Sequence, residues 1–146
     1  MTMKGKSYTY RTSIAWTSGV EGTLASPGKP SIKLSAPPEF KGPEGNWSPE
    51  NLLVAAVESC VMLTFLALAR SRKLEFVAYS SEAEGLLEPV YGKLVVSKVT
   101  VKPKIVVKNA ADVDAAREMM GQVEENCFIS NSVESEVVLQ PEIVAG

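Results

Sequence analysis

Two cysteines are the side chains in this sequence best suited to covalent or redox chemistry. The chain has 146 residues, its cysteines are Cys60 and Cys127, and it contains no histidine. The lack of histidine excludes Ser-His-Asp and Cys-His catalysis and histidine-ligated zinc or iron. Two cysteines are too few for a thiolate-ligated metal site or a secreted disulfide scaffold. Thiol redox chemistry is therefore the leading hypothesis, and no cofactor is expected.

Each cysteine also has a plain structural interpretation. Cys60 lies within an apolar segment and could be a buried, inert thiol. Cys127 follows Asn126, which could cap a short turn whose backbone N–H groups would stabilise a thiolate, although Phe128 and Ile129 could equally bury it. A disulfide between the two would stabilise the fold by about 4 kcal/mol in the chain-entropy model. In a reducing compartment, a disulfide that forms and breaks during turnover is favoured over a permanent one.

The N-terminal third has the period-two pattern of an antiparallel meander. A strand is predicted from Ser7 to Thr17, with Arg11 on the face opposite a row of large apolar residues. Another strand is predicted over residues 31–36, after a turn bracketed by Gly19 and Gly22. The apolar row consists of Tyr8, Tyr10, Ile14 and Trp16.

One long helix dominates the middle of the chain. Ser48 is a good N-cap, Pro49 suits the first helical position, and Glu50 suits the positive end of the helix dipole. Residues 52–69 are almost entirely apolar, which predicts a helix of roughly 22 residues and about 33 Å. A membrane span is the alternative, but Glu58 near the middle and the alternating strands on both sides favour a core or interface helix.

The segment after this helix predicts a β-hairpin. Strands are expected over residues 74–84 and 91–108, with a turn near Gly85 and Pro89. Pro103 indicates a bulge or an edge in the second strand.

A second helix and a last strand complete the predicted fold. Asn109 can cap a helix that ends near Glu125 and contributes its methionines to the core, and residues 134–144 predict a final strand. The expected fold class is α+β, with an antiparallel meander, a central hydrophobic helix, a hairpin, a second helix and a final strand. No linker or repeat divides the chain, so residues 1–146 are expected to form a single domain.

Two segments around the cysteines form a recognisable pattern. They are Pro49-Glu50-Asn51-Leu52-Leu53, Ala55-Ala56, Ser59 and Cys60, and far downstream Asn126-Cys127-Phe128-Ile129-Ser130. This pattern resembles the OsmC/Ohr family of thiol-dependent peroxidases over nearly the whole chain. The resemblance implies that Cys60 is the peroxidatic cysteine and Cys127 the resolving cysteine. It also implies an intertwined homodimer with the long helices at its centre, and a dithiol or lipoyl-type reductant.

The chain departs from the family pattern where an activating arginine is customary. Val20 and Glu39 occupy the two usual arginine positions, and Phe128 replaces the proline that usually follows the second cysteine. A thiol of ordinary pKa is only roughly 3% thiolate at neutral pH, so a nearby positive charge is needed. Arg11 is the preferred substitute, and Glu50 is expected to hold it over the partner's Cys60 across the dimer interface. Lys41, Arg70, Arg72 and Arg117 are the other cations that could take this place.

The sequence therefore predicts a cysteine-based peroxidase that reduces organic hydroperoxides through a Cys60–Cys127 disulfide. The alternative is a non-enzymatic redox sensor or a protein that binds a hydrophobic ligand on the same fold. A net charge of −2 gives no positive field for nucleic acid or an anionic membrane, so neither is expected as a partner. The first residues lack an apolar signal segment, which favours a cytoplasmic location.

Overall fold

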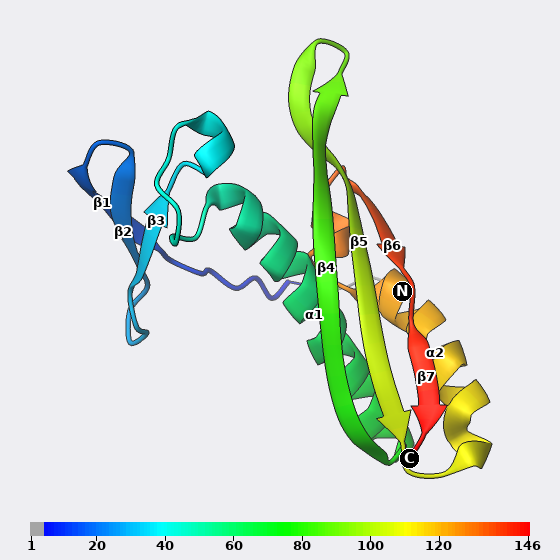
Figure 1. Cartoon of the computed structure of the whole chain (residues 1–146). Coiled ribbons are helices and arrows are strands. Elements are labelled where there is room, and N and C mark those ends of the chain that lie inside the picture. The colour runs from blue at the N-terminus through cyan, green and yellow to red at the C-terminus, as the bar shows by residue number, and fades with distance from the viewer. Residues whose placement is uncertain (1–4) are drawn as a thin grey trace. The chain divides into compact units, whose positions relative to one another are not determined.

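The secondary structure follows the α+β pattern expected from the sequence (Figure 1). The computed structural model describes residues 5–146. Contacts between residues divide the chain into two compact units, one that ends at Pro49 and one that runs from Glu50 to Gly146. The predicted fold class is confirmed, whereas the assignment of all 146 residues to a single domain stays a prediction.

The N-terminal unit contains a three-stranded antiparallel sheet in the order β1-β2-β3. Its turn between β1 and β2 contains Gly19 at a φ of 49°, a left-handed conformation that glycine adopts without strain. The short 3-10 helix η1 follows the sheet. The elements are β1 (Ser13–Ser18), β2 (Glu21–Ala25), β3 (Ile32–Ser35) and η1 (Pro38–Phe40).

The first strand is shorter and more exposed than predicted. It begins at Ser13 rather than Ser7, because pairing with β2 begins at Ser13 opposite Ala25, where β2 ends. Arg11 therefore precedes the strand, where its carbonyl oxygen accepts a hydrogen bond from Ser26 Oγ at 2.8 Å. The predicted apolar row is exposed in this chain, with Tyr8 and Tyr10 before the strand and Ile14 and Trp16 within it.

The long helix is present where it was predicted, as α1 (Pro49–Arg72). Every fourth residue from Val57 through Val61 and Phe65 to Ala69 is buried, so one stripe of α1 packs on the core. The helix is also long and apolar enough to cross a membrane, with an 18-residue window of mean hydropathy 2.3. Core helices of folded domains have the same length and composition, and the buried stripe fits that role.

Two long antiparallel strands follow, β4 (Phe76–Val90) and β5 (Lys93–Val107). The turn between them is Tyr91-Gly92, with φ of 50° and 78°, values typical of a type I′ hairpin turn. The predicted turn near Gly85 and Pro89 is wrong, because both residues lie within β4. Gly85 is needed there for close packing, since a Cβ at this position would lie 2.6 Å from Val54 Cγ2 on α1.

The predicted last strand is in fact two short strands, β6 (Glu136–Leu139) and β7 (Glu142–Ala145). They are separated at Gln140-Pro141, and each pairs in parallel with β5. Pairing with β6 covers residues 98–101 of β5 and pairing with β7 covers residues 104–107. Pro103 lies between these two segments without a register shift, so the bulge alternative is wrong.

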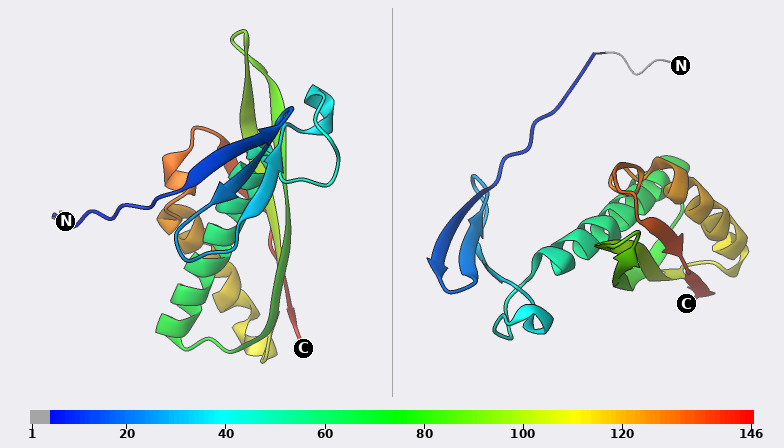
Figure 2. Two further views of the ribbon diagram at one scale, coloured as in Figure 1. Left: turned by 90° about the vertical axis from the view of Figure 1, so that its left-hand side faces the viewer. Right: turned by 90° about the horizontal axis from the view of Figure 1, so that it is seen from above.

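The second helix, α2 (Val113–Asn126), packs with α1 on one face of the sheet (Figure 2). A 3-10 turn, η2 (Ala110–Asp112), precedes it, so the helix begins later than Asn109, whose side chain makes no capping hydrogen bond. Met119 and Met120 are buried, which confirms their predicted place in the core. The main buried side chains are Val57, Val61, Phe65, Val99, Val101, Ile105, Val107, Ala116, Met119, Met120, Val123 and Cys127.

Candidate redox site

The fold brings Cys60 and Cys127 together from opposite ends of the C-terminal unit's sequence. Cys60 lies in the middle of α1, half-buried against the core. Cys127 is the residue at which α2 ends, and its backbone N–H still donates to the Val123 carbonyl at 3.0 Å. Both thiols are free, and the Cys127 thiol lies close enough to the Cys60 sulfur to lower the pKa of Cys60 as a hydrogen-bond donor. The two side chains that could form a reversible disulfide are therefore direct neighbours.

The surroundings of Cys60 favour its thiolate. Burial raises the pKa of Cys60, but hydrogen bonds outweigh this effect, so that the pKa lies below its ordinary value. The donors are the backbone N–H of Ile129, the thiol of Cys127, the hydroxyl of Thr64 and the backbone N–H of Phe128. Each of these groups is uncharged, so the acidity of Cys60 is raised by dipoles and not by a cation.

Thr64 contributes less than the Ile129 amide and the Cys127 thiol to the stabilisation of the Cys60 thiolate. Its Oγ1 lies 3.9 Å from Cys60 Sγ, one helical turn along α1. The same hydroxyl donates its proton to the Cys60 carbonyl oxygen at 2.7 Å. Because a hydroxyl has one proton to donate, the Ile129 amide and the Cys127 thiol are the donors that matter most for the thiolate.

The surroundings of Cys127 favour its protonated form. Its side chain is completely buried, and this burial raises the pKa of Cys127. The hydroxyl and backbone N–H of Ser130 lower that pKa, while the neighbouring Cys60 raises it, and the net direction is upward. Cys60 is therefore the nucleophile of the pair, and Cys127 is the protonated thiol that can donate a hydrogen bond to it.

The backbone amides of the turn after Cys127 act on both cysteines, whereas the sequence predicted an effect on Cys127 alone. The Ser130 amide lowers the pKa of Cys127 as expected, and the amides of Phe128 and Ile129 lower the pKa of Cys60. Asn126 does not cap this turn, since its side chain donates to the Gln122 carbonyl at the end of α2, at 2.8 Å. The physical reason is that the turn lies against α1, which places a residue distant in sequence at its amides.

Glu50 and Arg11, the other predicted site residues, lie in different units. Glu50 is in the first turn of α1, and its Oε1 is buried without a hydrogen-bond partner among residues 5–146. Arg11 belongs to the N-terminal unit and is exposed. Arg117 forms an exposed ion pair with Asp114 at 3.3 Å. The roles of Glu50 and Arg11 therefore stay predictions.

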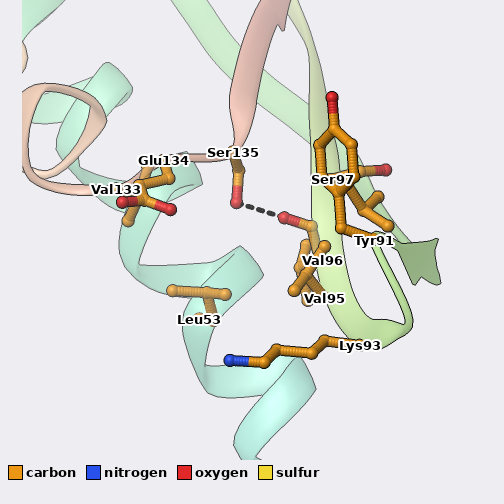
Figure 3. A pocket seen from close by; sticks show the side chains of 10 residues that line it. Leu53, Tyr91, Lys93, Val95, Val96, Ser97, Val133, Glu134 and Ser135 are labelled. Carbon is orange, nitrogen blue, oxygen red and sulfur yellow. Dashed lines mark hydrogen bonds between the residues drawn. The ribbon is translucent and has the colours of Figure 1, made fainter.

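A separate groove of about 640 Å³ opens between the start of α1, the tip of the β4–β5 hairpin and the segment before β6 (Figure 3). Leu53, Val95 and Val133 give it an apolar lining, and the Lys93 side chain reaches into it from the hairpin. Neither cysteine lines this groove. Within the described part of the chain, no group of three or more His, Cys, Asp or Glu side chains could hold a metal.

Two side chains beside the cysteine pair, those of Thr64 and Ser130, were given no role from the sequence. Thr64 was detectable, because it follows Cys60 at the four-residue spacing that places side chains on one helix face. Ser130 follows Cys127 by three residues, a spacing that also places two side chains on one face if the intervening turn is helical. The contact of the Ile129 amide with Cys60 has no sequence signal, since any residue type supplies an N–H group.

Comparisons with known proteins agree with this architecture. The sequence model of the family described as OsmC-like protein matches residues 42–142. The uncharacterized protein YmaD of Bacillus subtilis (strain 168) is 30% identical over 124 residues, which are 83% of this chain and 82% of that protein. An OsmC-like protein of unknown function from Vibrio cholerae O1 biovar eltor is structurally similar, with TM-score 0.86 and 29% identity over 92% of this chain and 99% of that chain. An organic hydroperoxide resistance protein OsmC from Legionella pneumophila has TM-score 0.74 and 22% identity over 96% of this chain and 99% of that chain. The chain is therefore a member of the OsmC-like protein family.

Proposed function

We propose that this protein is a thiol-dependent peroxidase that reduces organic hydroperoxides in the cytoplasm. The observation that carries the proposal is the direct pairing of Cys60, whose pKa is lowered, with the buried thiol of Cys127. Membership of the OsmC-like family supports it, as does the similarity in fold to an organic hydroperoxide resistance protein. A low-pKa thiol beside a second cysteine is the arrangement that oxidation to a disulfide requires.

The proposed reaction has three balanced steps. The Cys60 thiolate attacks the outer oxygen of the hydroperoxide, the O–O bond breaks, and an alcohol leaves once its oxygen has taken up a proton. Cys127 then attacks the sulfur of the Cys60 sulfenic acid, which releases water and forms the disulfide. A dithiol reductant, such as a lipoyl-type group, reduces the disulfide and is itself oxidised to a disulfide.

A peroxide-consumption assay tests this function. The protein is mixed with an organic hydroperoxide or with hydrogen peroxide, in the presence of a dithiol, and the loss of peroxide is followed. Turnover that saturates with organic hydroperoxide, and that is abolished in Cys60→Ser, is the expected result. If the wild-type protein consumes no more than one peroxide per chain, the enzymatic proposal is wrong.

A non-enzymatic redox sensor is the second candidate, and one observation favours it. The groups that lower the pKa of Cys60 within its own unit are uncharged donors, whereas a fast peroxidase gains much from a cation beside its thiolate. A sensor would undergo one stoichiometric oxidation to the Cys60–Cys127 disulfide and would not turn over with a dithiol. The same assay distinguishes the two functions.

A homodimer would supply a hydrogen-bond donor for the buried carboxylate oxygen of Glu50. Its buried oxygen without a partner calls for a donor from outside the described chain, and Leu63, which is 59% exposed on α1, leaves apolar helix surface to be covered. We expect a dimer by sedimentation at micromolar concentration, and a folded monomer there would contradict it. Arg11 is the proposed cation that joins Glu50 to the partner's Cys60.

Subunit mixing tests the proposed contact across the dimer. One chain carries Glu50→Ala and the other carries Cys60→Ser, so the intact Cys60 and the intact Glu50 are on different chains in the mixed dimer. If Glu50 acts across the interface, mixed dimers regain activity that neither variant has alone. Mixed dimers as inactive as the parent variants would show that Glu50 serves its own chain or only its helix.

A further inference from the structure

The turn that follows Cys127 places a second polar group beside its sulfur. The Asn131 N–H donates to the Cys127 carbonyl at 3.0 Å, so residues 127–131 form one helical turn. Residues three apart in such a turn share a face, and the Ser130 hydroxyl accordingly lies close enough to Cys127 to act on its thiol. The Ser130 oxygen is buried and has no hydrogen-bond partner among residues 5–146 of the reduced protein.

This hydroxyl without a partner needs an explanation, because a buried polar group that makes no hydrogen bond costs free energy. In the reduced protein Cys127 keeps its proton and acts as a hydrogen-bond donor toward Cys60, so Cys127 has no charge for Ser130 to bind. The hydroxyl would gain a partner in any state in which Cys127 is a thiolate. Such states arise only while the disulfide forms and breaks.

Access to the disulfide determines which sulfur becomes that thiolate. Cys127 has no exposed surface, whereas Cys60 is half-buried. An external thiol therefore reaches the Cys60 sulfur, and thiol–disulfide exchange there expels Cys127 as the leaving group. A leaving thiolate departs faster when its pKa is lower. Burial raises the pKa of Cys127, so by itself it makes Cys127 a poorer leaving group.

We propose that Ser130 is a positioning residue for Cys127, whose hydroxyl donates a hydrogen bond to the Cys127 thiolate as the disulfide forms and as it is reduced. The inference rests on the proposed function and specifies its second and third steps. In the third step a dithiol thiolate attacks the Cys60 sulfur, the S–S bond breaks, and its electron pair stays on Cys127, beside Ser130. The second thiol of the reductant then displaces Cys60 as a thiolate and closes the reductant's own disulfide.

The test separates disulfide exchange from reaction with peroxide. The Cys60–Cys127 disulfide is made with diamide in the wild type, Ser130→Ala and Ser130→Thr, and its reduction by dithiothreitol is timed. Ser130→Ala should slow reduction about tenfold, which is the effect of one hydrogen bond to a charged group. Ser130→Thr should restore the rate because it keeps the hydroxyl.

Two further measurements exclude a purely structural effect. Ser132→Ala removes a hydroxyl of the same turn, which donates to the Phe128 carbonyl at 2.7 Å, and should reduce at the wild-type rate. The first oxidation of Cys60 by organic hydroperoxide should be equally fast in Ser130→Ala and the wild type. After brief exposure to glutathione and trapping, peptide mapping should locate the mixed disulfide on Cys60.

Three results would overturn the inference. They are reduction of Ser130→Ala at the wild-type rate, equal slowing in Ser132→Ala, and a glutathione adduct on Cys127. Failure of the wild type to react with hydroperoxide would instead refute the proposed function. The diamide and dithiothreitol measurements would still decide the role of Ser130 in that case, because they use no peroxide.

Discussion

Replacing Cys127 by alanine is expected to make Cys60 less acidic. The Cys127 thiol is one of the donors that hold the pKa of Cys60 below its ordinary value, and alanine removes that donor while keeping the small size of the side chain. Cys127→Ser is the matched variant, because a hydroxyl can still donate to the Cys60 sulfur. Both variants leave Cys60 as the one cysteine of the chain.

The size of the effect follows from the kind of hydrogen bond that is lost. A hydrogen bond to a charged group contributes about 1.5–3 kcal/mol, and a thiol is a weak donor. We take about 1 kcal/mol, which corresponds to a roughly fivefold smaller thiolate fraction at a pH below the pKa of Cys60. Alkylation by iodoacetamide requires the thiolate, so Cys127→Ala should be alkylated about fivefold more slowly than Cys127→Ser at such a pH.

The assay is the rate of Cys60 alkylation as a function of pH, followed by intact mass. The Cys127→Ala curve should lie at higher pH than the Cys127→Ser curve, and the two should converge where Cys60 is fully ionised. Superimposable curves would refute the reasoning, because they would mean that residue 127 does not donate to the Cys60 sulfur.

Three other expected outcomes concern stability and pH. Gly85→Ala should destabilise the fold by about 1–3 kcal/mol, because its Cβ would lie 2.6 Å from Val54 Cγ2. Gly121→Ala, within α2 and with no atom within 4 Å of the added Cβ, should stabilise it by about 1 kcal/mol. Urea unfolding measures both, and shifts of the same sign would contradict the packing argument. Burial and the charge of Glu58 raise the pKa of Tyr79 to about 12. Since folding raises this pKa, the stabilising contribution of Tyr79 is present below pH 10 and should be lost as the pH rises toward 12. Glu58→Gln should lower the pKa of Tyr79, and tyrosinate absorbance that is unchanged by this substitution would exclude the charge effect.

The large elements could be predicted because their signals are local. Pro49 and the apolar run after it define α1 from its first residue, and the period-two pattern identifies the meander and the hairpin strands. The hairpin turn was misplaced because Gly85 and Pro89 are usual turn residues. Gly85 instead serves the close approach of Val54 on α1, which depends on tertiary packing.

The beginning of β1 and the division of the last strand depend on pairing, which a single sequence pattern does not contain. β1 begins at Ser13 because Ser13 pairs with Ala25, the last residue of β2, so residues before Ser13 have no partner in β2. The two parallel partners of β5 are separated at Gln140-Pro141, although residues 134–144 read as one apolar strand. Strand ends are thus determined by the neighbour in the sheet as much as by the strand itself.

The cysteines of the candidate site could be identified from residue types, whereas their electrostatics could not. A cation near Cys60 was expected from the sequence, but the groups that lower the pKa of Cys60 in the structure are hydrogen-bond donors, foremost the Ile129 amide. Backbone amides have no sequence signature, and their position depends on how the turn after Cys127 packs on α1. The same holds for the burial that raises the pKa of Cys127.

Treatment with a single equivalent of organic hydroperoxide tests whether Cys60 and Cys127 act as one redox pair. We expect a chain that loses two hydrogens in intact mass and yields one peptide pair linked through Cys60 and Cys127. We also expect that Cys127→Ser stops at a Cys60 sulfenic acid. A wild-type chain that stays reduced, or that accumulates sulfinic acid at Cys60 without forming the disulfide, would contradict this pairing.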